Sequence, residues 1–264
     1  MGAGTRIRVQ DVGKIYGVGS KQVEALKGVD LDIRDNEFVC MVGPSGCGKS
    51  TLLRIIADLQ RPSAGEVEVT TSAAALRPSA VVFQDYSIYP WKTVKDNVKF
   101  GLLAQNLPKA EVEDRVSRWL DKLSLTAFAD HYPSQLSGGM RQRVAIARAM
   151  VVESEILLMD EPFAALDAQL RRVLQEELLD LWQDMRRTVL FITHNLDEAI
   201  LLGDRVVVMS GRPGRVIGDY EVPFGRPRNA EIRGSADFAA LEQELWHQLR
   251  HEVDDGAAAR AEVA

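Results

Sequence analysis

The chain has 264 residues, of which 46% are hydrophobic and 27% are charged, and it carries a formal net charge of −6. This composition excludes a disordered chain, and the acidic balance without a long basic stripe argues against a nucleic-acid partner. The length fits one large α/β domain, or a domain that carries an inserted subdomain.

The first third of the chain alternates between predicted strands and one helix. Residues 6–42 are expected to form strands, because Ile7 and Val9 alternate with polar residues, as do the apolar residues of 29–33. The continuously apolar run at 38–42 predicts a central buried strand. From Lys49 on, apolar residues recur at three- and four-residue spacing, which predicts a helix that ends before Pro62 and Gly65.

The middle of the chain predicts a parallel sheet that is interrupted by helices. Buried strands are expected at 80–83, 156–159 and 189–193, with a helix at 170–185, and this alternation favours parallel pairing. Residues 94–150 are expected to be mostly helical and to form an insertion, while 71–78 reads as a surface loop.

The end of the chain predicts one amphipathic helix, because Phe238, Leu241, Leu245, Leu249 and Val253 recur at near-helical spacing. Beyond residue 255 the chain is expected to be frayed. We therefore expect one domain at 6–232, with a helical subdomain inserted at about 85–152, followed by a C-terminal helix and tail at 233–264.

The segment GPSGCGKS at residues 43–50 fits the P-loop pattern G-x-x-x-x-G-K-[ST]. Glycines let backbone N–H groups surround phosphate oxygens, and the start of the following helix adds partial positive charge. Lys49 would reach the β- and γ-phosphates, and the Ser50 hydroxyl would bind Mg²⁺. From residue frequencies, a chance match arises in roughly one such chain in a hundred. The strand before it and the helix after it favour the functional interpretation.

A second motif, ILLMDE at 156–161, is an apolar strand that ends in two carboxylates. Asp160 would hold Mg²⁺ through water, and Glu161 would orient or deprotonate the attacking water. An acidic pair after a strand is more often a solvated loop, but a position downstream of a P-loop favours the catalytic role.

A third motif, LSGGM at 136–140, has a structural explanation, because Ser137 would cap the helix that follows it. However, the order P-loop, Gln84, LSGGM, ILLMDE, Asp167 and His194 resembles the ABC ATPase family over about residues 6–225. This resemblance implies an α/β fold. It would have a P-loop NTPase (RecA-like) core with a mainly parallel sheet, an N-terminal antiparallel β subdomain and an inserted α-helical signature subdomain. It also implies an ATPase that uses ATP and Mg²⁺.

The resemblance also assigns roles to single residues. Tyr16 would stack on adenine, although it could be an ordinary surface tyrosine, and Gln84 would touch Mg²⁺ and sense a permease. LSGGM would bind the γ-phosphate held by an opposite subunit, and Asp167 would lie at the dimer interface. His194 would contact the γ-phosphate, although a lone histidine after a strand is usually structural.

The expected site residues fall into three groups. The catalytic residues are Glu161, His194, Lys49 and Gln84. The nucleotide-binding residues are Tyr16, Gly43, Pro44, Ser45, Gly46, Cys47, Gly48, Lys49, Ser50, Thr51, Gln84, Ser137, Gly138, Gly139 and Asp167. The metal-binding residues are Ser50, Gln84 and Asp160.

Weaker features resemble the nitrate/sulfonate/taurine importer ATPases and imply import of a small anion. They are Pro90-Trp91, GRPGRV at 211–216, VPFGRPR at 222–228 and the C-terminal helix. Three features depart from the family pattern: Asp58 replaces a usual glycine, Asn195 replaces a usual aspartate, and the loop at 71–78 lacks the usual glycines.

The resemblance implies a second copy of the chain as a head-to-tail partner, a transmembrane permease, and indirectly a solute-binding protein. Residues 84–100 would contact the permease through Tyr89 and Trp91, unless Trp91 packs under its own helical subdomain. The two cysteines, Cys40 and Cys47, suggest no structural disulfide, and MGAGTRIRVQ shows no signal peptide. No apolar stretch approaches the ~18–20 residues of a membrane span, so another chain would have to supply any span. The resemblance implies a peripheral subunit at the cytoplasmic face of the membrane.

Three alternatives remain at this stage. The chain could serve an exporter or another solute, or it could be a non-transport ABC ATPase for DNA maintenance or translation. Those non-transport proteins resemble tandem cassettes or carry long coiled coils, and this sequence has one cassette and no long heptad pattern. A P-loop kinase or GTPase is disfavoured by LSGGM, by His194 and by the lack of an Asn-Lys-x-Asp motif.

Overall fold

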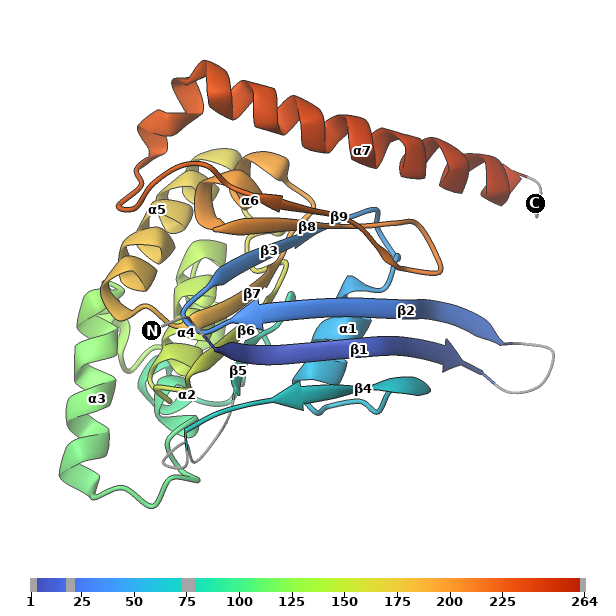
Figure 1. Cartoon of the computed structure of the whole chain (residues 1–264). Helices are drawn as coiled ribbons and strands as arrows, with labels where there is room; N and C mark the ends of the chain where they lie inside the picture. The colour runs from blue at the N-terminus through green and yellow to red at the C-terminus, as the bar shows by residue number, and fades with distance from the viewer. Residues whose placement is uncertain (1–3, 18–21, 73–78, 262–264) are drawn as a thin grey trace. The chain divides into compact units, whose positions relative to one another are not determined.

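The computed structural model describes residues 4–17, 22–72 and 79–261, so most of the predicted loop at 71–78 lies outside the described residues (Figure 1). The chain forms two compact units. The first contains residues 1–71 and 175–264, and the second contains residues 72–174.

The first unit begins with a three-stranded antiparallel sheet. Its strands lie in the order β2-β1-β4 and have the bounds β1 (Thr5–Tyr16), β2 (Val23–Arg34) and β4 (Ala64–Val69). Val9 pairs with Leu31 and both are buried, while their polar neighbours face solvent, which confirms the predicted sheet with one wet face. The pattern of β4 gave no prediction, because this edge strand buries none of its six residues.

A second set of strands forms the centre of the first unit, in the order β7-β3-β8-β9. Their bounds are β7 (Thr188–Ile192), β3 (Phe38–Val42), β8 (Arg205–Met209) and β9 (Val216–Glu221). The first three strands are parallel, and β9 pairs antiparallel with β8. Because β3 lies between two neighbours, all five of its residues are buried, as its apolar run predicts.

Helices cover this sheet, and one of them packs an aromatic ring against an aromatic ring of the central strand. They are α1 (Lys49–Ile56), the part of α5 (Ala168–Met185) that belongs to this unit and begins at Gln175, α6 (Leu196–Leu202) and α7 (Ala236–Ala261). The short turn η4 (Ala230–Gly234) precedes α7. The ring of Phe38 lies 5.5 Å from that of Trp182 on α5 and 5.8 Å from that of Phe191 on β7.

The helix α7 runs beside α6 and β8 (Figure 1). Phe238, Leu241, Leu245 and Leu249 are buried, which confirms the predicted amphipathic helix. The helix α7 continues past residue 255, where the sequence predicts a frayed end, and it ends at Ala261. The alanines and arginine of this segment are good helix formers, which explains the extension.

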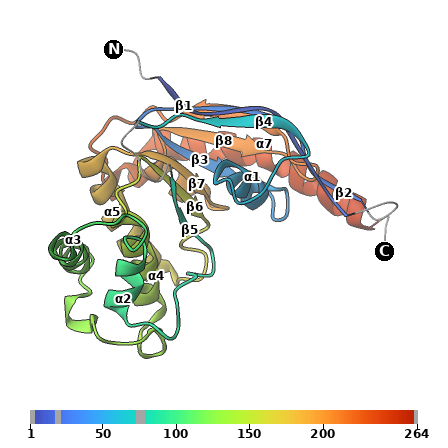
Figure 2. The same ribbon diagram turned by 90° about the horizontal axis from the view of Figure 1, so that it is seen from below.

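The second unit combines a parallel strand pair with the predicted helices. The pair consists of β5 (Ser79–Val82) and β6 (Ile156–Asp160). Between them lie α2 (Val94–Phe100), α3 (Lys109–Lys122), the turns η2 (Thr126–Phe128) and η3 (Pro133–Gln135), and α4 (Gly138–Met150). The helices α2, α3 and α4 lie beside one another (Figure 2) and bury Val98, Val116 and Val144.

The end of α1 explains why a glycine is usual at position 58. Asp58 has a φ of 55°, which is the left-handed conformation that glycine adopts most easily. Its N–H donates to the carbonyl of Ile55 at 3.0 Å, and the N–H of Leu59 donates to the carbonyl of Arg54 at 2.9 Å. These two bonds form a Schellman motif, in which residue 58 occupies the left-handed position after the helix.

Replacement of Asp58 by glycine should stabilise the protein by about 0.5–1 kcal/mol, because it relieves the cost of a side chain in the left-handed region. Urea unfolding of Asp58→Gly and of the native chain would measure this difference. Asp180→Gly, at an exposed position inside α5, is the matched control and should destabilise by about 1 kcal/mol. An Asp58→Gly variant that is less stable than the native chain would contradict the assignment of this cap.

Candidate functional site

The loop at residues 43–48 joins the carboxyl end of β3 to the start of α1. Gly48 caps α1 with a φ of 110°, and a Cβ there would lie 2.7 Å from Leu26 Cδ2 and 2.8 Å from the Ala25 carbonyl oxygen. Only glycine fits this position. The first N–H groups of α1 therefore follow the loop directly, and they have no partners within the helix. Such a helix start attracts anions.

The Lys49 side chain folds back over this loop and is only 4% exposed. Its Nζ donates hydrogen bonds to the carbonyl oxygens of Gly43 at 2.7 Å and Pro44 at 3.0 Å. These bonds compensate for the burial of the ammonium group. Phosphate oxygens would form stronger, charge-assisted bonds to the same group, so an anion could compete with the carbonyls.

Tyr16, at the end of β1, lies beside the first turns of α1. Its hydroxyl is 3.2 Å from Thr51 Oγ1 and donates to Gln60 Oε1 at 3.0 Å. The side chain is partly exposed, and Lys14 Nζ lies 5.4 Å from the centre of its ring. The hydroxyl bonds fix the ring close to the loop that precedes α1.

His194 follows β7 and lies at the same sheet edge as the loop after β3. The two strands are parallel, Met41 is opposite Ile192, and the N–H of Thr193 donates to the carbonyl of Met41 at 3.1 Å. His194 is exposed. The carboxyl edge of a parallel sheet is where ligands bind in such folds.

A buried polar network holds the segment around His194. Glu198 is 3% exposed; it accepts a hydrogen bond from the Thr193 hydroxyl and another from Gln175 Nε2 at 2.9 Å. The Asn195 side chain accepts a bond from the Glu198 N–H at 3.2 Å and caps α6. Asparagine and aspartate are equally good caps, so the cap of α6 is kept although position 195 holds asparagine in place of the usual aspartate.

In the second unit, Gln84, Asp160 and Glu161 gather at one edge of the strand pair. The strands β5 and β6 are parallel with Val82 opposite Met159, and the three residues follow these positions closely. Asp160 ends β6 and is buried, and Glu161 turns the chain with a φ of 45°. A non-glycine residue in this conformation is uncommon and is often found at functional sites.

Ser137 and Asp167 both occupy the start of a helix in this unit. The Ser137 hydroxyl accepts a hydrogen bond from the Met140 N–H at 3.3 Å and caps α4, whose first turn contains Gly138 and Gly139. Asp167 Oδ1 accepts bonds from the N–H groups of Gln169 at 3.1 Å and Leu170 at 3.0 Å. The predicted cap at Ser137 is confirmed, and the exposed hydroxyl remains next to a helix start that would favour an anion.

The part of the chain that the structure describes forms no complete metal site by itself. The described residues contain no cluster of three or more histidine, cysteine, aspartate or glutamate side chains that could hold a metal ion. Mg²⁺ usually takes only one or two protein ligands and completes its shell with water and phosphate oxygens. One hydroxyl, Ser50, and one carboxylate, Asp160, fit that chemistry.

The segment after Gln84 exposes large aromatic side chains, and Trp91 is the most exposed of them. Trp91 is 71% exposed, so the alternative that it packs under its own helices is wrong. The ring of Tyr89 lies 4.6 Å from that of Phe100 and 5.6 Å from that of Trp91.

Two polar residues that the sequence analysis missed hold this segment. Asn97, fully buried, donates to the carbonyls of Tyr89, Lys92 and Thr93. Arg148 donates to the carbonyls of Tyr86 and Ser87, and burial lowers the pKa of its guanidinium. Asn97 could have been noticed as an amide on the apolar side of a short helix pattern.

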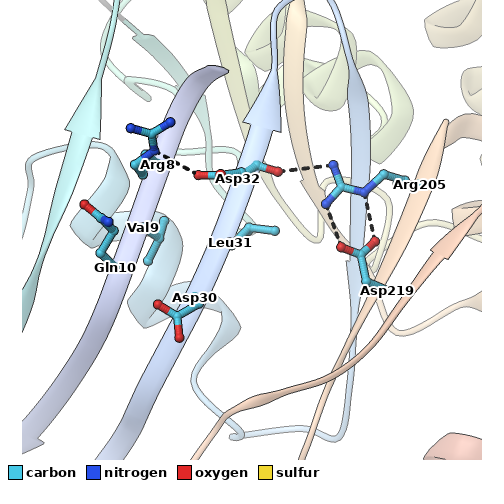
Figure 3. A pocket seen from close by; sticks show the side chains of 8 residues that line it. All are labelled: Arg8, Val9, Gln10, Asp30, Leu31, Asp32, Arg205 and Asp219. Atoms are coloured by element: carbon cyan, nitrogen blue, oxygen red, sulfur yellow. Dashed lines mark hydrogen bonds and ion pairs between the residues drawn. The ribbon is translucent and has the colours of Figure 1, made fainter. Parts of the chain in front are cut away.

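A pocket of about 330 Å³ lies elsewhere in the first unit, between β1, β2, β8 and β9 (Figure 3). Arg205 forms two bonds to the Asp219 carboxylate, at 2.8 and 2.7 Å, and Arg8 lies 3.4 Å from Asp32. The bonds to Asp219 raise the pKa of Arg205 above its usual value. Two arginines and three aspartates line this pocket, and none of the predicted site residues does.

Three comparisons with known proteins bear on these features. The family model described as ABC transporter matches residues 26–164. An uncharacterized ABC transporter ATP-binding protein of Methanocaldococcus jannaschii is 45% identical over 94% of this chain and 92% of its own length. The nitrate import ATP-binding protein of Synechocystis sp. is 42% identical over 92% of this chain and 95% of its own length.

A solved structure has a similar fold. It is the dimeric structure of a post-hydrolysis state of an ATP-binding cassette bound to ADP and Pi, with a TM-score of 0.72 and 33% sequence identity. The match covers 83% of this chain and all of that chain. Among the described residues, no helix combines the length and the apolar composition that a bilayer span requires.

We expect Tyr16 to stack on adenine, and this expectation predicts how its substitution affects the KM for ATP. Tyr16→Ala should raise the KM for ATP by roughly 5- to 150-fold, because base stacking on an aromatic ring is worth about 1–3 kcal/mol. Tyr16→Phe keeps the ring and loses only the hydroxyl bonds to Thr51 and Gln60, so it should raise the KM for ATP less than about tenfold. Steady-state ATPase assays measure both values.

Ile15→Ala is the matched control, because Ile15 is the exposed neighbour of Tyr16 on β1. The KM of the Ile15→Ala variant for ATP should stay within about twofold of the native value, as expected for an exposed side chain that lies away from the base. If Tyr16→Phe were as impaired as Tyr16→Ala, the hydroxyl bonds rather than stacking would explain the effect.

Proposed function

The chain belongs to the ABC transporter family, and we propose that it is the ATP-hydrolysing subunit that energises solute import through a partner membrane permease. ATP binding and hydrolysis are properties of this family, and the similar solved structure holds the products ADP and Pi. The observation that carries the assignment is the loop at 43–48, in which Gly48 and the buried Lys49 form an anion-binding helix start.

In this proposal the first unit binds the nucleotide. Lys49 would exchange its bonds to the Gly43 and Pro44 carbonyls for bonds to the β- and γ-phosphates, and Ser50 would hold Mg²⁺. The N–H groups of the loop and of α1 would surround the phosphates. The ring of Tyr16 would stack on adenine, and His194 would donate a hydrogen bond to the γ-phosphate from the same sheet edge.

The second unit would supply the remaining catalytic groups. Asp160, buried at the end of β6, would bind the Mg²⁺ shell through water, and Gln84 would contact the same ion. Glu161 would accept a proton from the attacking water or orient it toward the γ-phosphate. Mg²⁺, when bound, would neutralise charge on the phosphate oxygens.

A second copy of the chain would close the site. In the proposed head-to-tail dimer, Ser137, Gly138 and Gly139 of one copy would face the γ-phosphate held by the other copy. The Ser137 hydroxyl and the start of α4 provide suitable donors. Asp167 would lie at the same interface, where its carboxylate fixes the start of α5. Nucleotide binding would then favour the closed dimer, and hydrolysis would release it.

The proposed permease contact lies at residues 84–100. Trp91 is 71% exposed in a segment that Asn97 and Arg148 hold in place, and an exposed tryptophan on a fixed backbone suits a protein interface. This docking would place the chain at the cytoplasmic face of the membrane as a peripheral subunit. The proposed solute is a small anion such as nitrate, a sulfonate or taurine, delivered by a solute-binding protein; the nitrate import relative supports this class.

Reconstitution with the partner permease and solute-binding protein tests the transport function. Vesicles that contain the complete complex should take up labelled nitrate, sulfonate or taurine only when ATP is supplied. Trp91→Ala should reduce uptake at least tenfold, as expected for an interface hot spot, while the isolated subunit keeps its ATPase activity. ATP hydrolysis without uptake of any small anion would contradict the importer proposal.

Glu161→Gln tests the catalytic carboxylate and the dimer together. It should slow turnover by about 10²- to 10⁴-fold, because the amide cannot accept a proton from water, while ATP binding is preserved. The variant should therefore accumulate as an ATP-bound dimer, which light scattering with Mg-ATP would detect.

Lys49→Ala is the control for this experiment, because loss of the fixed cation should weaken ATP binding and leave a monomer. A Glu161→Gln variant that stays monomeric at high concentration and hydrolyses ATP at the native rate would refute both roles.

A further inference from the structure

The loop that joins β8 to β9, residues 210–215, lies directly against the loop at 43–48. Arg212 donates two hydrogen bonds to the carbonyl oxygen of Gly46, from Nε at 3.2 Å and from Nη2 at 3.0 Å. Gly214 approaches the next residue so closely that a Cβ would lie 2.1 Å from the Cys47 carbonyl oxygen. Two successive carbonyls of the phosphate-binding loop therefore contact the 210–215 loop.

The Gly46–Cys47 peptide is held from both sides. Arg212 binds its carbonyl oxygen, and the N–H of Cys47 donates to the carbonyl of Pro44 at 3.3 Å. A peptide group is planar, and its C=O and N–H point in opposite directions, so a bond on each side fixes the plane. Gly46 has a φ of 77° and no side chain that could hold this conformation by packing.

The 210–215 loop is itself rigidly bound. The Ser210 hydroxyl donates to the carbonyl of Gly211 at 2.9 Å and accepts a bond from the N–H of Arg215 at 3.0 Å. Gly214 donates to the carbonyl of Ala25 at 2.9 Å and accepts from the N–H of Lys27 at 3.1 Å, so β2 fixes the loop as well. Arg212 thus extends from a fixed backbone.

The C-terminal helix supplies a further anchor. The Glu252 carboxylate accepts a hydrogen bond from the N–H of Gly211 at 2.9 Å, one residue before Arg212. The adjacent turn of α7 is held by the buried Leu249 and by Gln248, which donates to the carbonyl of Ile217 on β9 at 3.3 Å. A series of bonds therefore runs from α7 through the 210–215 loop to the phosphate-binding loop.

We propose that Arg212 is a positioning residue for ATP: it holds the Gly46–Cys47 peptide so that the phosphate-binding loop is formed before ATP arrives, and Glu252 of α7 anchors it. This inference rests on the proposed role of the 43–50 segment in binding phosphate. A loop that is already ordered loses less conformational freedom when the ligand binds, which raises affinity. A Gly46 carbonyl released from Arg212 could rotate toward the phosphates and repel them.

Substitutions in the full-length chain test this role. Arg212→Ala should raise the Kd for a fluorescent ATP analogue and the KM for ATP by about tenfold, as expected for loss of a charge-assisted hydrogen bond. The kcat at saturating ATP should change less than about twofold, because Arg212 touches no reacting atom. Arg212→Lys should restore part of the affinity, because an ammonium group can still donate to the Gly46 carbonyl.

Arg215→Ala is the matched control, since Arg215 is an exposed arginine of the same loop and its substitution removes the same positive charge as Arg212→Ala. If positive charge alone mattered, Arg215→Ala would weaken ATP binding as much as Arg212→Ala does, and the proposal would be overturned. Glu252→Ala should raise the Kd about two- to threefold through the loop, which is a weaker effect because the anchor is indirect.

Hydrogen exchange of the nucleotide-free protein separates this inference from the proposed function. The amides of residues 43–50 should exchange several-fold faster in Arg212→Ala than in the native chain and in Arg215→Ala, whether or not ATP binds. Unchanged exchange together with an unchanged Kd would refute the positioning role. A native chain that failed to bind the ATP analogue would instead refute the proposed function. In that case, faster exchange in Arg212→Ala would still support the role of Arg212 in holding the Gly46–Cys47 peptide.

Discussion

The backbone conformation of the phosphate-binding loop is the constraint on which the rest of the site depends. Gly48 must adopt a left-handed conformation in a space that no Cβ can enter, because Leu26 and the Ala25 carbonyl are too close. This geometry turns the chain from the buried strand β3 directly into α1. It aims the first N–H groups of the helix at the sheet edge, where an anion can accept hydrogen bonds from them. The burial of Lys49 over the same loop adds a cation whose present partners are neutral carbonyls.

The chemistry of the chain is divided between its two compact units. The first unit carries the phosphate-binding loop, Tyr16 and His194, and the second carries Gln84, Asp160 and Glu161. Each unit places its groups by the same device, since parallel strands bring residues distant in sequence to one carboxyl edge.

Polar side chains hold several loop segments of this protein in place. Glu198 fixes the backbone beside His194, Asn97 and Arg148 fix the segment that exposes Trp91, and Arg212 fixes the Gly46 carbonyl. Each case pairs a polar side chain with backbone or hydroxyl groups, which orders a loop that has little apolar surface of its own. For the buried Glu198 and Asn97, these bonds also offset the cost of desolvation.

The sequence by itself determined the family, the α/β class and the buried central strands, and it predicted a phosphate-binding role for the loop at 43–48. These features depend on local properties: the spacing of glycines, the positions of hydroxyl and acidic residues, and runs of apolar residues. Such properties can be read directly from the sequence. Only the tertiary structure revealed the edge strand β4, the exposure of Trp91 and the contact of Arg212 with Gly46, which is 166 residues away in sequence. These features depend on which segments pack together, and a solvent-facing edge strand or a long-range hydrogen bond leaves no periodic signal in the residues that form it.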